Sequence, residues 1–233
     1  MAQIECSNLV KTYSVAGQKI NALDGVSFSS VSGEFVVVVG PSGSGKTTLL
    51  NLLGGMDTPT SGDIVVEGKN IAVYSAKELT EYRRGGVGFV FQFYNLMPNL
   101  TAIENVELAV EICKNPLDPK SILLEVGLKD RLNSFPAQLS GGEQQRVSIA
   151  RSVAKNASLI LCDEPTGALD YETGKKILKL LHSICKQHNK TIILVTHNSA
   201  LKDMADKVIF MKNGTIERQE VNATPKAIED IDW

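Results

Sequence analysis

The chain has 233 residues, 43% of them hydrophobic, and can bury a large core as one α/β domain or as a core with an inserted subdomain. Its 24 Lys and Arg against 26 Asp and Glu give a net charge of −2, which argues against nucleic acid as the main partner. The four cysteines, Cys6, Cys113, Cys162 and Cys185, show no C-x-x-C spacing, which argues against a zinc site or a disulfide framework and is typical of a reducing compartment.

The N-terminal segment MAQIECSNLVK lacks both the basic start and the apolar stretch of a signal peptide. No apolar run in the chain approaches the roughly 20 residues that a membrane-spanning helix needs. We therefore expect a cytoplasmic protein, and any role at a membrane must come through a partner.

The first buried strand is expected at FVVVV, residues 35–39, which leads through GPSGSGKT, residues 40–47, into the helix-like TLLNLL. This segment fits G-x-x-x-x-G-K-[ST] in the strand–loop–helix context of a phosphate-binding loop, whose backbone amides ring the phosphates. We expect Lys46 to contact the β- and γ-phosphates of a nucleotide, Thr47 to ligate Mg²⁺ and Thr48 to reach the α-phosphate. The expected phosphate-binding residues are Gly40, Pro41, Ser42, Gly43, Ser44, Gly45, Lys46, Thr47 and Thr48.

Three features follow along the chain. GDIVVEGKNI, residues 62–71, is typical of a hairpin in an antiparallel layer beside the core. VGFVF, residues 87–91, predicts a second buried strand, and Gln92 follows it directly. Residues 93–150 carry helical patterns punctuated by prolines, without a convincing buried strand, and predict an inserted helical subdomain; these prolines are Pro98, Pro116, Pro119 and Pro136.

Within that span, LSGGEQQR, residues 139–146, predicts the start of a helix. Ser140 and Glu143 have the spacing of a capping box. Capping does not require Gly141 and Gly142, and each glycine costs about 0.5–1 kcal/mol against alanine. Bare backbone at a helix N-terminus suits an anion. The segment therefore predicts a second phosphate site, so either two nucleotides bind or one nucleotide is held from two sides.

LILCDE, residues 159–164, predicts a buried strand that ends in two carboxylates. In an open parallel sheet the ligand lies beyond the carboxyl ends of the strands, so Asp163 and Glu164 should lie beside the phosphate loop. We expect Asp163 to hold Mg²⁺ and Glu164 to polarise the attacking water. Gln92 is assigned to Mg²⁺ and the attacking water. His197, after the strand at 191–195, is assigned to the γ-phosphate, although a lone His at a strand end also suits a structural role.

The last third of the chain continues the alternation of strands and helices. A helix at 172–188 places four apolar side chains on one face, namely Ile177, Leu180, Leu181 and Ile184. It lies between two strands, so a βαβ unit follows. Residues 208–211 form an apolar run like those of the core strands, and KVIFMKNGTIERQE, residues 207–220, is also typical of a hairpin, which we assign to the antiparallel layer. Residues 221–233 are expected to be a loosely ordered tail.

These elements predict an α/β fold, a P-loop NTPase core with a mostly parallel sheet, a flanking antiparallel β layer and an inserted helical subdomain. GPSGSGKTT, FVFQ, LSGGEQQR, LILCDEPTGALD and VTH stand in the order and spacing of an ATP-binding cassette (ABC) ATPase, which the chain resembles over nearly its whole length. The resemblance implies one nucleotide-binding domain over residues 1–220, with its core at 1–92 and 151–220, its helical subdomain at 93–150 and a tail at 221–233.

The same resemblance implies further site residues. Tyr13, in KTY, would stack on adenine; from the residues alone, Tyr13 is only an alternating position near a strand. Two copies would form a head-to-tail homodimer around two ATP molecules, in which Ser140, Gly141 and Gly142 of one copy face the phosphate loop of the other. Asp170, in GALD, would lie along the seam and couple the two sites.

FQFYNLMPNLTAIENVEL and DEPTGALDYETG resemble the branch of macrolide exporters, lipoprotein-release ATPases and antimicrobial-peptide resistance transporters. Cys162 and Asn198 depart from the Ala and Asp that are common there, without removing a catalytic group. The branch implies an ATPase subunit, with ATP and Mg²⁺, on the inner face of the membrane. It would drive a separate transmembrane permease in export or membrane extraction of a peptide, lipid-like or drug substrate.

Two questions stay open at this point. Residues 93–97, FYNLM, either receive a short helix of the permease or belong to the subdomain core. The chain could also be an ATP-gated scaffold or signalling subunit of a complex that transports nothing, as the cell-division cassette is. Soluble relatives that act on DNA or ribosomes usually carry coiled-coil insertions or two cassettes, and this sequence has neither, so no nucleic-acid partner is expected.

Overall fold

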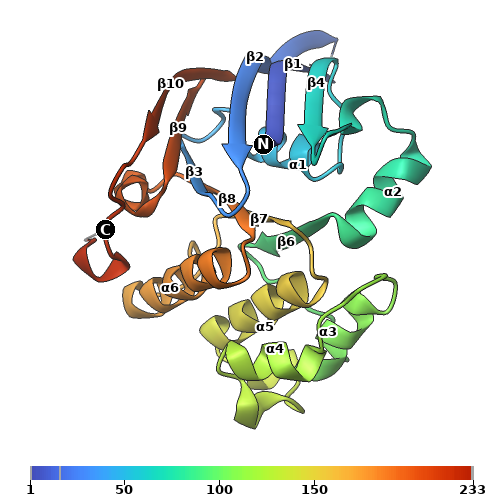
Figure 1. Ribbon diagram of the computed structural model, residues 1–233, viewed down its shortest axis with the longest axis vertical. Coiled ribbons are helices and arrows are strands. Elements are labelled where there is room, and N and C mark those ends of the chain that lie inside the picture. Colours follow the sequence, from blue (N-terminus) through green and yellow to red (C-terminus); the bar gives the residue numbers. More distant parts are fainter. Residues whose placement is uncertain (1, 16, 232–233) are drawn as a thin grey trace.

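The computed structural model describes residues 2–15 and 17–231 (Figure 1). Its larger sheet has six strands in the order β10-β9-β3-β8-β7-β6. They span β3 Phe35–Val39, β6 Val87–Phe91, β7 Leu159–Asp163, β8 Thr191–Thr196, β9 Lys207–Lys212 and β10 Thr215–Val221. Neighbours from β9 to β6 are parallel, and β10 runs antiparallel to β9. The expected parallel core is therefore confirmed, with strand ends that differ by one residue at most.

Strand β3 explains why the core strands read as unbroken apolar runs. Phe35, Val37 and Val39 face the cluster that contains side chains of α5 Gly141–Ala154 and α6 Tyr171–Gln187. Val36 and Val38 face the opposite cluster, beneath the smaller sheet. Both faces are buried, and no side chain of the strand is more than 3% exposed. A parallel sheet covered on both faces requires this pattern.

The smaller sheet is antiparallel, in the order β2-β1-β4-β5. Its strands are β1 Ala2–Val15, β2 Gln18–Val31, β4 Ser61–Val66 and β5 Lys69–Asn70. The hairpin expected at 62–71 is confirmed as β4 and β5. The hairpin expected at 207–220 also forms, but its place in this layer was wrong. Strand β9 pairs in parallel with β3 instead, because Val208, Ile209 and Met211 are buried in the larger sheet.

The remaining helices are α1 Lys46–Leu53, α2 Ala76–Gly85, α3 Ala102–Val110 and α4 Pro119–Glu125. Short 3₁₀ turns lie at Ile71–Val73, Lys129–Arg131, Pro136–Gln138, Ser199–Met204 and Ile228–Asp230. Helices α3, α4 and α5 gather at the end of the molecule opposite the smaller sheet (Figure 1). Residues 92–140, all of them described, contain helices and turns but no strand. The helix expected at 172–188 is confirmed as α6, which starts and ends one residue earlier.

The expectation of a loosely ordered tail was wrong for residues 221–231. Strand β10 ends at Val221, and Ile228 and Ile231 are then 7% and 4% exposed within the larger core cluster. Lys226 pairs with Asp203 at 2.8 Å. The tail is ordered because its two isoleucines cover apolar surface on α6. Residues 232–233 lie outside the described residues.

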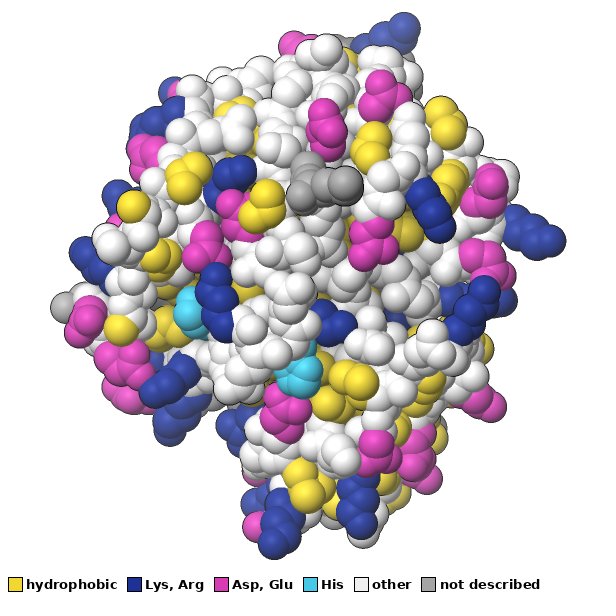
Figure 2. Space-filling view, viewed as in Figure 1, with side chains coloured by type: hydrophobic (Ala, Val, Ile, Leu, Met, Phe, Trp, Pro, Cys, Tyr) yellow, Lys and Arg dark blue, Asp and Glu magenta, His cyan; other side chains and the backbone are white. Residues whose placement is uncertain are grey.

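Figure 2 shows positive and negative side chains interspersed over one face of the molecule. None of the helices in the described ranges has the length and apolar character needed to cross a bilayer.

Candidate nucleotide site

The loop between β3 and α1 is shaped by glycines that have no room for a side chain. Gly45, the N-cap of α1, has a φ of +97°, and a Cβ placed on it would collide with the carbonyl oxygen of Ala22 in β2. A Cβ on Gly40 would collide with the carbonyl oxygen of Met211 in β9. The loop therefore packs directly on the backbone of two strands.

Lys46 and Ser44 give this loop the properties of an anion site. Lys46 Nζ donates to the carbonyl oxygens of Gly40 and Pro41 at 2.7 and 3.0 Å. Burial lowers the pKa of Lys46, and the carboxylates of Glu164 and Asp163 oppose that shift. The Ser44 hydroxyl is buried without a hydrogen-bond partner among the described residues. An ammonium held only by neutral carbonyls and an orphaned hydroxyl both suit a bound phosphate.

Two carboxylates lie beside the loop, where the end of β7 was expected to place them. Thr47 Oγ1 lies 3.5 Å from Asp163 Oδ1. Burial and the charge of Glu164 raise the pKa of Asp163. A cavity of about 440 Å³ is lined by Tyr13, residues 42–48 and both carboxylates. The structure thus brings these predicted residues together in one place.

Glu164 directly follows β7, and its carboxylate is held by residues at the end of the neighbouring strand β8. Its Oε1 accepts the backbone N–H of His197 at 2.8 Å and lies 2.9 Å from His197 Nδ1. Its Oε2 accepts the Thr196 hydroxyl at 3.0 Å. The backbone of Glu164 has a φ of +47°, in the left-handed region that residues other than glycine rarely adopt. A strained residue with a fixed carboxylate is a common feature of a catalytic site.

The other expected residues lie apart from that cavity. Glu164, Asp170 and His197 line a second cavity of about 270 Å³. Asp170 Oδ1 caps α6 by accepting the N–H of Thr173 at 3.0 Å, and these hydrogen bonds lower the pKa of Asp170. Gln92 lies against the turn after Glu164, because a Cβ on Gly167 would be 2.8 Å from Gln92 Nε2.

The LSGGEQQR segment forms the capping box that its spacing predicts. Ser140 Oγ accepts the N–H of Glu143 at 3.3 Å, and Glu143 Oε2 accepts the N–H of Ser140 at 2.8 Å. The glycines also have a cause within the chain. A Cβ on Gly141 would be 2.8 Å from Tyr94 Oη, and one on Gly142 would collide with the methyl group of Thr173. Packing against these two side chains therefore also favours glycine here, whether or not an anion binds.

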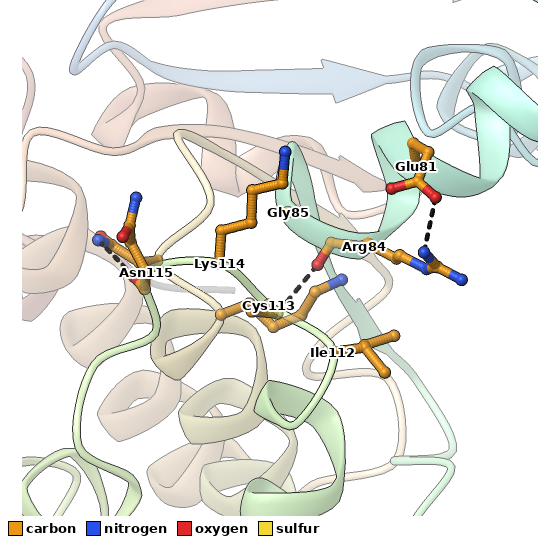
Figure 3. Close-up of a pocket in the computed structure, with 9 residues that line it drawn as sticks. Glu81, Arg84, Gly85, Ile112, Cys113, Lys114 and Asn115 are labelled. Carbon is orange, nitrogen blue, oxygen red and sulfur yellow. Dashed lines mark hydrogen bonds and ion pairs between the residues drawn. The ribbon is translucent and has the colours of Figure 1, made fainter.

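A further cavity, of about 330 Å³, lies between the end of α2 and the segment after α3 (Figure 3). Arg84 pairs there with Glu81 at 2.6 Å, and the Cys113 thiol donates to the Arg84 carbonyl oxygen at 3.0 Å. None of the predicted site residues lines this cavity.

Comparison with known proteins decides the family. The family model described as "ABC transporter" matches residues 23–167. The chain belongs to the ABC transporter family. The cassette is 43% identical over 229 residues to an uncharacterised ABC transporter ATP-binding protein, MJ0796 of Methanocaldococcus jannaschii, covering 93% of this chain and 96% of that protein. It is 42% identical to the lipoprotein-releasing system ATP-binding protein LolD 2 of Chlorobaculum tepidum, covering 92% and 91%.

A solved structure agrees with this assignment. A dimeric structure of the MJ0796 cassette matches with a TM-score of 0.85 and 41% identity, over 94% of this chain and 98% of that one. The same relative has been solved in a dimeric post-hydrolysis state bound to ADP and Pi. The chain thus has the fold of an ATP-binding cassette whose relative binds ADP and phosphate. Against a relative from Mycoplasma pneumoniae, named a putative ABC transporter ATP-binding protein, it is 45% identical but spans about half that protein's length.

Sequence reasoning missed the residues that hold Tyr13 in the cassette. Tyr13 Oη donates to Asp57 Oδ2 at 2.8 Å. Lys11 Nζ donates to Asp57 Oδ1 at 2.5 Å and lies 5.0 Å from the centre of the Tyr13 ring. Lys11 and Tyr13 are two residues apart on one strand, so they share a face, and this spacing was the available signal. Asp57 comes from the loop after α1, and no local pattern connects it to β1.

The raised pKa of Asp163 predicts a cost in stability. The folded state holds the Asp163 proton more tightly than the unfolded chain does. Proton binding at Asp163 therefore favours the folded state at low pH. This stabilisation is lost as the pH rises from 3.8, the ordinary pKa of an aspartate, through the raised pKa of the folded state. In metal-free buffer we expect Asp163→Asn to unfold at a higher temperature than the natural chain at neutral pH, with the gap closing below about pH 4.

Thermal melts across pH check this expectation. The matched control is Asp130→Asn, because Asp130 is exposed and does not line the cavity. This variant should leave the midpoint temperature of unfolding unchanged. Equal midpoints for Asp163→Asn and the natural chain at neutral pH would contradict the argument. A stabilised but inactive variant is the expected pattern for a residue kept for function.

Proposed function

We propose that two copies of the cassette bind two ATP molecules between them, head to tail. Each ATP is held by the phosphate loop of one copy and by Ser140, Gly141 and Gly142 of the other. The observation that carries this proposal is that the second helix N-terminus lines no part of the 440 Å³ cavity in its own copy. A two-fold dimer supplies each cavity with the missing half. The dimeric structure of the relative at 41% identity supports a dimer of this cassette.

Within each site, Lys46 contacts the β- and γ-phosphates, Thr48 reaches the α-phosphate and Tyr13 stacks on adenine. Thr47 and Asp163 would hold Mg²⁺. Their hydroxyl and carboxylate oxygens are the donors that this cation prefers. When bound, Mg²⁺ neutralises charge on the β- and γ-phosphates. Gln92 lies at Gly167 and joins this set only if its side chain turns toward the cavity.

Neighbouring polar groups have different roles in ATP hydrolysis. The oxygen of water attacks the γ-phosphorus, the bond to the β–γ bridging oxygen breaks, and the products are ADP and phosphate. Glu164 takes the proton of that water, since its carboxylate is fixed by Thr196 and His197. His197 contacts the γ-phosphate. Asp170, in the cavity next to Glu164, couples the two sites across the seam.

Shared sites predict that activity depends on protein concentration. At dilution below the dimerisation constant each copy lacks half of its site, so phosphate release per mole of chain should fall with the fraction of dimer. The measurement is steady-state phosphate release over a wide range of protein concentrations at saturating ATP. A constant specific activity in the monomeric range would contradict the dimer.

The dimer drives a separate membrane permease, in export or in extraction of a substrate from the membrane. The LolD 2 relative, named for lipoprotein release, favours a lipid-like substrate over a drug or peptide. Some relatives have about the length of this cassette, and others are about twice as long. A permease fused to the cassette is therefore the alternative to a separate permease. The permease would contact Phe93 and Met97, which are 73% and 52% exposed.

Replacing these two side chains tests the membrane partner. Phe93→Asp with Met97→Asp should abolish co-purification with a multi-pass membrane protein and leave ATPase activity of the isolated cassette within about twofold. Tyr94 is unsuitable for this purpose because it packs on Gly141. Val73→Asp, at another exposed apolar residue, is the matched control. Retained co-purification would contradict the docking role, and a partner with no transport activity would favour the signalling alternative.

A further inference from the structure

The loop that follows Gln92 has an unusual backbone. Tyr94 and Asn95 both have positive φ, at +51° and +50°. Two consecutive residues other than glycine in the left-handed region are uncommon, and such a turn persists only where the surroundings hold it. The position of Gln92, two residues earlier, depends on this turn.

Arg151, on α5, is the side chain that holds the turn. Its Nη1 donates to the carbonyl oxygen of Asn95 at 2.7 Å, and its Nη2 donates to that of Tyr94 at 2.9 Å. The guanidinium fork thus binds both strained peptides at once. Arg151 takes part in none of the ion pairs found among the described residues, so its charge is directed at these carbonyls. Burial lowers its pKa.

The same helix contacts the turn a second time, at its own beginning. The Tyr94 hydroxyl lies against Gly141, where a Cβ would be 2.8 Å from Oη. Between these two contacts, Gln145 is fully buried, and its Nε2 donates to the carbonyl oxygen of Pro165 at 2.6 Å. Pro165 follows Glu164 directly. Helix α5, which begins with the LSGGEQQR segment, therefore touches both the loop after Gln92 and the turn after Glu164.

We propose that Arg151 is a positioning residue for ATP hydrolysis and that Tyr94 carries its effect to Gly141. Arg151 keeps the Tyr94–Asn95 turn in its left-handed form. The Gln92 backbone then stays beside the turn after Glu164, from which its side chain can turn toward the cavity, and the Tyr94 hydroxyl stays on the helix that faces the second nucleotide. The loop after β6 and the LSGGEQQR segment then move as one unit. This inference rests on the proposed function of those residues.

The first experiment separates chemistry from binding in the full chain. Because Arg151 lies outside the 440 Å³ cavity, Arg151→Met should lower kcat by about tenfold or more and change KM for ATP by less than about twofold. Arg151→Lys should recover part of kcat, since an ammonium can still reach one carbonyl. The matched control is Arg218→Met, at an exposed arginine on β10, which should keep full activity.

A second experiment tests the contact itself and does not require Arg151 variants to fold. Tyr94→Phe should lower kcat and leave KM for ATP within about twofold, because it removes the hydroxyl that contacts Gly141. Unchanged kcat in Tyr94→Phe or in Arg151→Met overturns the inference, and the proposed function still stands if the natural chain hydrolyses ATP as a dimer. A natural chain that is equally active as a monomer overturns the proposed function instead.

Discussion

Glu164→Gln will slow ATP hydrolysis by about two to four orders of magnitude without weakening ATP binding. Glutamine keeps the size of glutamate, and its oxygen can still accept the N–H of His197. The Thr196 hydroxyl, which donates to Glu164 now, can rotate to accept from the new amide. The local structure is therefore preserved, and the missing property is the ability to take a proton.

The consequence should be visible in the state of assembly. If ATP is held between two copies and cannot be cleaved, Glu164→Gln with ATP should sediment as a stable dimer, and the natural chain should return to monomer as ATP is consumed. The matched control is Glu125→Gln, at a carboxylate that contacts His188 at 2.7 Å far from the cavity, and it should turn over normally. Full activity of Glu164→Gln would exclude it as the general base, and monomer with ATP would argue against the sandwich.

The parallel core could be predicted from the sequence because each of its strands is buried on both faces. The run FVVVV, for example, is sufficient evidence of such a strand by itself. The long pair β1 and β2 gave no comparable signal, because its pairing register shifts at several places between Ala2 and Thr12. Each shift interrupts the alternation of buried and exposed residues on which a strand prediction depends.

Some residues of the candidate site could also be predicted from the sequence, and some of its contacts could not. The phosphate loop, Asp163 and Glu164 could be predicted because parallel strands deliver their ends to one edge of the sheet. The contacts of Gly141 with Tyr94 and of Tyr13 with Asp57 join residues that are distant in sequence. No local period encodes such contacts. They were accessible only once the chain was folded, and they change the interpretation of the glycines in LSGGEQQR from a ligand requirement alone to a packing requirement as well.

Mixing two inactive variants should restore activity if the sites are shared. Lys46→Ala removes the cation of the phosphate loop, and Ser140→Arg blocks the opposite helix end with a bulky side chain at an exposed position. In a mixed dimer both defects fall on one site, and the other site combines two natural halves. Random pairing makes about half of the dimers mixed, so up to about a quarter of the sites should be intact.

The measurement is phosphate release from each variant alone and from an equal mixture allowed to exchange subunits. Each variant alone should be nearly inactive, and the mixture should reach at most about a quarter of natural activity, or less if the two sites must act together. Ser75→Arg serves as the matched control, because it places the same bulky side chain on the exposed N-cap of α2, which does not line the cavity. If mixed dimers form and stay inactive while Ser75→Arg remains active, each copy must complete its own site, and the LSGGEQQR glycines would be explained by Tyr94 and Thr173 alone.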